Sequence, residues 1–160
     1  MKKDASLHEI KKELLLHPPS ELVELCIRIA KYKKENKELL GYLLFEADDK
    51  TAFLKNIKSE MDVNFKNIDI YSNLYFIKKS LRKQLRILTK YNKFSADKAL
   101  SAEVLIYFCK KLKTSGIPYQ KSQQLVNLFE QQLKKINGLI ETLHEDLQYD
   151  LLKEVDSLGK

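Results

Sequence analysis

Residues 125–147 read LVNLFEQQLKKINGLIETLHEDL, and their apolar side chains recur at alternating spacings of three and four residues. This spacing is typical of a heptad seam, and the seam residues are Val126, Phe129, Leu133, Ile136, Ile140, Leu143 and Leu147. Leu125 and Leu139 widen the seam, which suits a helix in a bundle better than a two-stranded coiled coil. We therefore predict a long, heptad-patterned C-terminal helix with Gly138 on its solvent side.

The rest of the chain shows helical periodicity with few interruptions, because its 160 residues include only four glycines and three prolines. The expected helix starts are Ser6 (with Glu9 in a capping box), Ser20, Asn36, Asp48 or Asp49, Ser72 or Asn73, and Leu100. Residues 37–47, KELLGYLLFEA, are apolar on most sides, so this helix is expected to lie centrally. No linker divides the chain, and the predicted fold is all-α, a single-domain bundle of six to eight helices over residues 1–160.

Hydropathy and cysteine usage bear on the compartment. No apolar run approaches the roughly 20 residues that a membrane span needs, and the N-terminal stretch MKKDASLHEI lacks the apolar core of a secretory signal. Cys26 and Cys109 form no CxxC pair, and each follows apolar residues at helical spacing. Buried free thiols are typical of a reducing compartment, so the sequence predicts a cytoplasmic protein with no membrane span.

The formal net charge of +7 is unevenly distributed. Residues 1–70 hold thirteen basic and thirteen acidic side chains, whereas residues 71–121 hold twelve basic and only two acidic ones. Residues 122–160 hold four basic and seven acidic side chains. The central segment therefore carries the whole excess of positive charge.

Most of that excess lies on the helix predicted to begin at Ser72 or Asn73. At about 100° per residue, its basic side chains fall in one sector, about 40° to 180° from Leu74 and away from the apolar stripe. They are the candidate partner-binding residues Lys78, Lys79, Arg82, Lys83, Arg86 and Lys90. Lys110, Lys111 and Lys113 on the following helix would extend this sector if the two helices pack as antiparallel neighbours.

Like charges four residues apart destabilise a helix by a few tenths of a kcal/mol per pair. The sector is therefore either a merely solvated face or a face whose repulsion is offset by a counter-charge. The final acidic segment, with Glu130, Glu141, Glu145 and Asp146, is one internal source. An acidic protein and a nucleic acid are two external sources. With only three arginines in the chain and no recognisable helix-turn-helix, nucleic-acid binding would be backbone-directed.

Motifs for catalysis are scarce. The sequence contains no glycine-rich phosphate loop, no GxSxG and no HExxH. Glu141 and His144 form one ExxH, the spacing used in di-iron bundles, but no second copy occurs. In the heptad frame Glu141 faces solvent, so we interpret this cluster as a solvated face and assign no catalytic residue, metal or cofactor.

The leading hypothesis is a non-enzymatic helical interaction module that uses the basic helix face toward an acidic protein surface or an acidic face of its own copy. The alternative is backbone-directed nucleic-acid binding through the same face. A metal-dependent enzyme at the Glu141 and His144 cluster is the third hypothesis.

Overall fold

The computed structural model describes residues 4–159 and contains helices and no strand within them. The α-helices are α1 (Leu7–Leu14), α2 (Pro19–Tyr32), α3 (Lys34–Phe45), α4 (Lys50–Lys66), α5 (Leu74–Ser95), α6 (Lys98–Thr114), α7 (Gln123–Ile140) and α8 (Glu145–Leu158). A 3-10 helix, η1, spans Tyr119–Lys121. The predicted all-α class with six to eight helices is confirmed.

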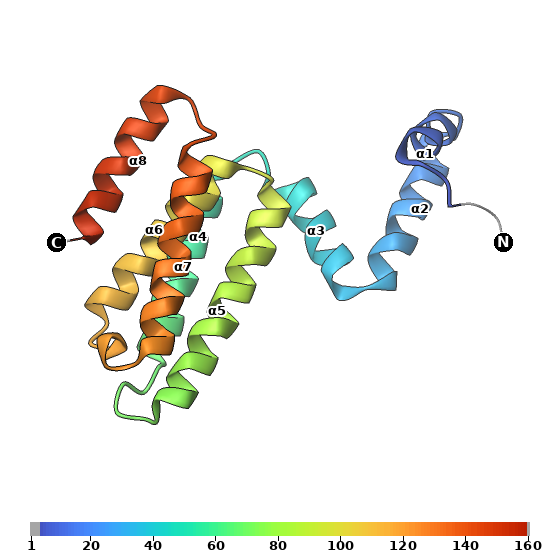
Figure 1. Cartoon of the computed structure of the whole chain (residues 1–160). Helices are drawn as coiled ribbons and strands as arrows, with labels where there is room; N and C mark the ends of the chain where they lie inside the picture. The colour runs from blue at the N-terminus through green and yellow to red at the C-terminus, as the bar shows by residue number, and fades with distance from the viewer. Residues whose placement is uncertain (1–3, 160) are drawn as a thin grey trace. The chain divides into compact units, whose positions relative to one another are not determined.

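The chain divides into two compact units, residues 1–45 and residues 46–160. The first unit contains α1 to α3 and the second contains α4 to α8 (Figure 1). A single domain over residues 1–160 stays a prediction.

Two helices of the first unit begin earlier than expected. The capping box is confirmed, because the Ser6 amide donates to Glu9 Oε2 at 2.7 Å and the Glu9 amide donates to Ser6 Oγ at 3.3 Å. Helix α2, however, begins at Pro19 rather than after Ser20, because the fixed φ of proline suits the first helical position. Helix α3 begins at Lys34, and Asn36 lies within it and donates to the Ile29 carbonyl of α2 at 2.9 Å.

The first unit exposes much of its apolar surface. It carries thirteen of the twenty large apolar residues that are exposed among those described: Leu7, Ile10, Leu14, Leu15, Leu16, Val23, Leu25, Ile27, Ile29, Tyr32, Leu43, Leu44 and Phe45. The expected central position of residues 37–47 is wrong, since Leu44 and Phe45 are 63% and 83% exposed. An all-round apolar sequence is therefore not sufficient for burial here.

Helix α6 is the centre of the second unit. It contacts α4, α5, α7 and α8 (Figure 1). Its buried residues are Leu100, Ser101, Ala102, Val104, Leu105, Ile106, Phe108, Cys109 and Leu112. The surrounding helices bury narrower stripes against it, such as Phe65 of α4, whose ring centroid lies 5.5 Å from that of Phe108. The core of the second unit is thus organised around one helix that is buried on most sides.

The predicted long C-terminal helix is divided into α7 and α8. Helix α7 ends at Ile140, and α8 begins at Glu145 after His144, whose Nδ1 accepts from the Asp146 amide at 3.4 Å. Helix α7 has 18 residues and already matches the 17 residues of α6, each about 26 Å long. A continuous helix would extend past the end of α6. The turn after Ile140 instead brings α8 back, so that it contacts both α6 and α7.

The two cysteines differ in exposure. Cys109 is buried in α6, as expected, and burial raises the pKa of its thiol to about 12. Cys26 is exposed, which corrects the expectation of two buried thiols. Its helix α2 leaves many of its apolar side chains uncovered. Among the described residues, no helix combines the length and the apolar character that crossing a membrane requires.

Candidate interaction surface

The basic face consists of Lys78, Lys79, Arg82, Lys83, Arg86 and Lys90 of α5. Helix α5 begins after Asn73, whose Oδ1 accepts from the Tyr75 amide at 2.9 Å. On the other side of α5, Ile77, Leu81 and Leu88 are at most 1% exposed. Because these side chains fix the orientation of the helix, the basic side chains are directed away from the core.

Four members of the basic face are exposed, namely Lys79, Arg82, Lys83 and Arg86. None of these four forms a salt bridge with any residue of the described chain. Lys78 and Lys90 are half-buried. Lys78 donates to Gln124 Oε1, and the Lys90 amine lies 5.5 Å from the Tyr91 ring centroid. Four positive charges therefore have no counter-charge within salt-bridge distance among residues 4–159.

The described acidic side chains of the final segment form no salt bridge with these four residues. Glu130, Glu141 and Glu145 are exposed and, like the four cations, form no salt bridge within residues 4–159. Asp146 lies 3.6 Å from His144. The contacts thus give no support to internal neutralisation of the four exposed cations by these acidic side chains.

Lys110, Lys111 and Lys113 of α6 do not extend the basic face as free charges. Lys110 Nζ lies 2.6 Å from Glu154 Oε2, and Lys111 Nζ lies 2.6 Å from Asp62 Oδ1. Lys113 donates to the Leu158 carbonyl at the end of α8. These three lysines hold helices together inside the second unit, in contrast to the exposed cations of α5.

Two ion pairs of the second unit shift the pKa values of their carboxylates. Hydrogen bonding from Lys111 holds the pKa of Asp62 below its ordinary value of 3.8, and Tyr107 donates to the same carboxylate at 2.8 Å. Lys50 donates to Asp97 Oδ2 at 2.7 Å and lowers the pKa of that carboxyl in the same way. Burial acts oppositely on Glu103 and raises its pKa.

These shifts predict a loss of stability in acid. A carboxyl whose pKa is lowered by folding contributes stability above its unfolded pKa and loses it as the pH falls through the folded value. Asp62→Asn is therefore expected to destabilise the protein at pH 7 by about 0.5–1 kcal/mol, because the pair is one-third exposed and screened by solvent. Urea unfolding at a series of pH values measures this difference, which should shrink below about pH 4.

Asp150→Asn serves as the control, because Asp150 is exposed and forms no ion pair with another described residue. A constant difference between wild type and Asp62→Asn down to pH 2 would contradict the prediction.

Glu103 changes the stability of the protein in the opposite direction. Its pKa is raised by folding, so its contribution to the free energy of unfolding becomes more favourable as the pH falls.

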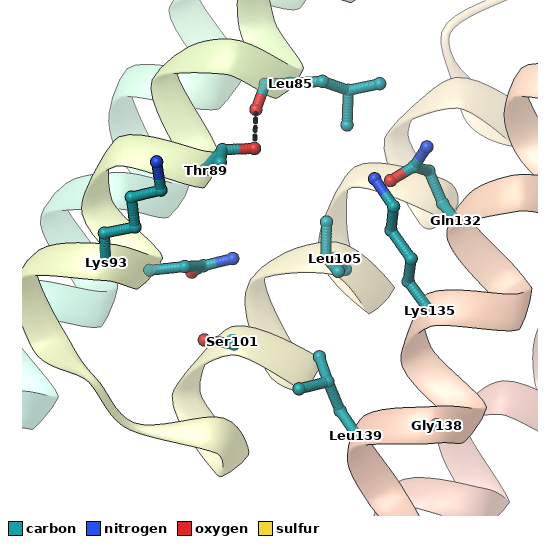
Figure 2. A pocket seen from close by; sticks show the side chains of 10 residues that line it. Leu85, Thr89, Lys93, Ser101, Leu105, Gln132, Lys135, Gly138 and Leu139 are labelled. Carbon is teal, nitrogen blue, oxygen red and sulfur yellow. Dashed lines mark hydrogen bonds between the residues drawn. The ribbon is translucent and has the colours of Figure 1, made fainter.

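A groove of about 480 Å³ lies between α5, α6 and α7 (Figure 2). Leu85, Leu105 and Leu139 form its apolar part, and the amines of Lys93 and Lys135 come from its two sides, α5 and α7. Neither lysine forms a salt bridge with a residue that the structure describes. The exposed positive surface therefore extends beyond the six residues predicted from the sequence.

Sequence reasoning missed both lysines. Lys93 is seven residues after Arg86 and falls in the same sector of α5, about 100° from Leu74, so the helical angle alone identifies it. Lys135 belongs to another helix, and only the packing of α7 beside α5 and α6 brings it to the groove. No local pattern in the sequence indicates that proximity.

The ExxH pair does not lie on one helix. Glu141 follows the last residue of α7, and His144 is the N-cap of α8. Within residues 4–159, no group of three or more His, Cys, Asp or Glu side chains has the arrangement of a metal site. The turn separates the two side chains that a shared helix face would have brought together.

Comparison with known proteins gives no match to a protein-family model, to a curated protein or to a solved structure.

Proposed function

We propose that this protein is a non-enzymatic helical interaction module that binds an acidic protein surface through the basic face of α5. The observation that carries this proposal is that Lys79, Arg82, Lys83 and Arg86 are exposed and form no salt bridge with other described residues. A partner carboxylate would offset the repulsion between cations four residues apart on the helix. The module as proposed acts without a cofactor or metal.

Exposed aromatic residues beside the cations favour a protein partner. Tyr75 is 60% exposed and lies two turns before Arg82, on the same side of α5. Phe76 is 58% exposed, and its ring contacts that of Tyr75 with centroids 5.4 Å apart. Tyrosine and arginine are the residues that most often contribute binding energy at protein interfaces.

Self-association is a second form of the same proposal. Glu130, Glu141 and Glu145 are exposed on the second unit and are available to the basic face of another copy. Sedimentation at low and high salt would separate this case, because attraction between exposed charges weakens as salt increases. Backbone-directed binding of nucleic acid is the alternative for the same face.

The proposal also places the module in the cytoplasm. Two free cysteines, Cys26 and Cys109, support this location. Proteins of oxidising compartments commonly pair their thiols in disulfides, whereas thiols stay reduced in the cytoplasm.

Arg82→Glu combined with Arg86→Glu is expected to weaken binding to an acidic protein at least tenfold. Each exposed ion pair is worth about 0.2–1 kcal/mol, and reversal replaces two attractions by two repulsions, so a loss of about 1.4 kcal/mol or more is expected. Fluorescence anisotropy with a labelled glutamate-rich peptide measures the affinity at several salt concentrations. Folding should be retained, because both positions are exposed.

The matched control is Lys55→Glu combined with Lys98→Glu, which changes the net charge equally at exposed positions of α4 and α6. This control should retain most of the affinity. Equal binding by the α5 variant and wild type would refute the proposal. Binding to duplex DNA but not to the peptide would favour the nucleic-acid alternative. In that case the logarithm of the affinity should fall linearly with the logarithm of the salt concentration, with a slope of about −0.9 for each phosphate contact.

A further inference from the structure

A polar cavity of about 240 Å³ lies between α4 and α5, beside the basic face. Its apolar lining consists of Phe65, Ile68 and Ile87. Its polar lining consists of Asn64, Asn67, Ser80, Lys83 and Gln84. Lys83 belongs to both the cavity and the basic face, so the two features form one continuous surface.

The polar side chains of this cavity make no hydrogen bonds with other described residues. Gln84 is the most notable of them, because it is only 4% exposed. Gln132, the other buried glutamine, is 3% exposed and donates to the Leu128 carbonyl of its own helix at 3.3 Å. Gln84 lines the cavity and its amide has no hydrogen-bond partner among the described residues, so the amide is free to bind a group that enters the cavity.

The lining has the chemistry of an anion site. It offers a lysine ammonium, three side-chain amides and one hydroxyl as donors, and it includes no carboxylate. Asp69, close to Asn67 in the chain, accepts from the Tyr71 amide at 3.0 Å within its own turn. Lys79 lies one helical turn before Lys83 and adds positive charge near the cavity. Donors with a nearby cation stabilise an oxyanion more strongly than they stabilise a neutral group.

We propose that this cavity binds a single oxyanion group, a carboxylate or a phosphate, carried by a side chain of the acidic protein partner. This inference rests on the proposed function and specifies what anchors the partner. The volume of about 240 Å³ is below the range of about 300–1,000 Å³ that is usual for sites of whole small molecules. The cavity therefore takes one side-chain group, while the exposed cations of α5 contact the surrounding acidic surface.

The test is a titration of the full-length ¹⁵N-labelled protein with inorganic phosphate and, separately, with acetate. The side-chain amide signals of Asn64, Asn67 and Gln84 are expected to shift together and to saturate with at least one of the two anions. The anion that binds more tightly identifies the group as a phosphate or a carboxylate. Shifts spread over the lysines without saturation, or no shifts at all, would overturn the proposal.

Gln84→Leu should weaken anion binding at least tenfold while leaving the melting temperature unchanged or higher. The reason is that Gln84 is only 4% exposed and its amide makes no hydrogen bond with another described residue, so a leucine of similar size removes no contact within the described chain. Gln132→Leu is the matched control, because it removes a buried glutamine outside this cavity and should leave anion binding unchanged. Lys83→Gln, at an exposed position, gives a second variant if Gln84→Leu fails to fold.

The glutamate-rich peptide separates this inference from the proposed function. If the peptide binds and Arg82→Glu with Arg86→Glu abolishes its binding, but Gln84→Leu does not weaken the binding of either anion, the cavity proposal fails and the proposed function stands. If phosphate or acetate saturates the cavity but the peptide does not bind, the proposed function fails and the cavity is an anion site without that partner.

Discussion

Phe108→Ala is expected to lower the free energy of unfolding by about 3–5 kcal/mol, the usual range for removing a buried phenylalanine. Phe108 is 0% exposed on α6, the helix that contacts every other α-helix of the second unit. Its ring meets that of Phe65 at an interplanar angle of 60°, so the substitution also removes an aromatic contact worth about 0.5–1.5 kcal/mol. Urea unfolding followed by circular dichroism gives the change.

Phe76→Ala is the matched control for this prediction. Phe76 is 58% exposed on α5, and substitutions at exposed positions usually change stability by less than about 0.5 kcal/mol. A loss below about 1 kcal/mol for Phe108→Ala would contradict the central position of α6, because a buried ring cannot be removed from a packed core at so small a cost.

Two substitutions on α7 are expected to act in opposite directions. Ile136 is 0% exposed, so Ile136→Ala should destabilise the protein by about 2–5 kcal/mol. Gly138, two residues later, is exposed, and a Cβ added there meets no atom within 4 Å. Gly138→Ala should therefore be neutral or stabilising by up to about 1 kcal/mol, because alanine favours the helix. Thermal and urea unfolding of both variants measure the two changes.

The sign of the Gly138→Ala effect is the sharper test. If α7 continues through Gly138 to Ile140, as the structure has it, alanine cannot destabilise strongly. A loss above about 1 kcal/mol would mean that the helix is interrupted at this glycine. Phe129→Ala tests the burial of α7 at another position. Phe129 is 9% exposed and its ring lies beside that of Tyr119, so the substitution should lower the free energy of unfolding by about 3–5 kcal/mol.

Several helix starts were predictable from the sequence because capping is local. The side chains of Ser6, Asp49 and Asn73 each accept from a backbone amide two or three residues later, so a short stretch of sequence contains both partners. The expected starts at Ser20, Asn36 and Leu100 are the exceptions, because α2, α3 and α6 begin at Pro19, Lys34 and Lys98. Ser20 and Asn36 have suitable side chains, but the prolines before Ser20 and the early start of α3 place both residues inside helices.

The direction of the α5 side chains was predictable for a similar reason. Helical periodicity places Ile77, Leu81 and Leu88 on one side of α5 and the cations on the other. The same periodicity predicted a seam along residues 126–147, and Phe129, Ile136 and Ile140 of that seam are buried. Leu147 is 45% exposed after the turn into α8. Periodicity indicates which side of a helix is apolar, but it does not determine where the helix must end against its neighbours.

The sequence by itself therefore determined the helical class, many of the helix starts and the direction of the basic side chains on α5. Only the tertiary structure decided that α6 is central and that α7 ends at Ile140. It also decided that Lys110 and Lys111 of α6 form ion pairs, while the exposed cations of α5 form no salt bridge with another described residue. Lys110 and Glu154, for example, are 44 residues apart in the chain and 2.6 Å apart in space. Caps and periodicity depend on residues within a few positions of each other, whereas burial, counter-charge and the cavity at Gln84 depend on which helices become neighbours.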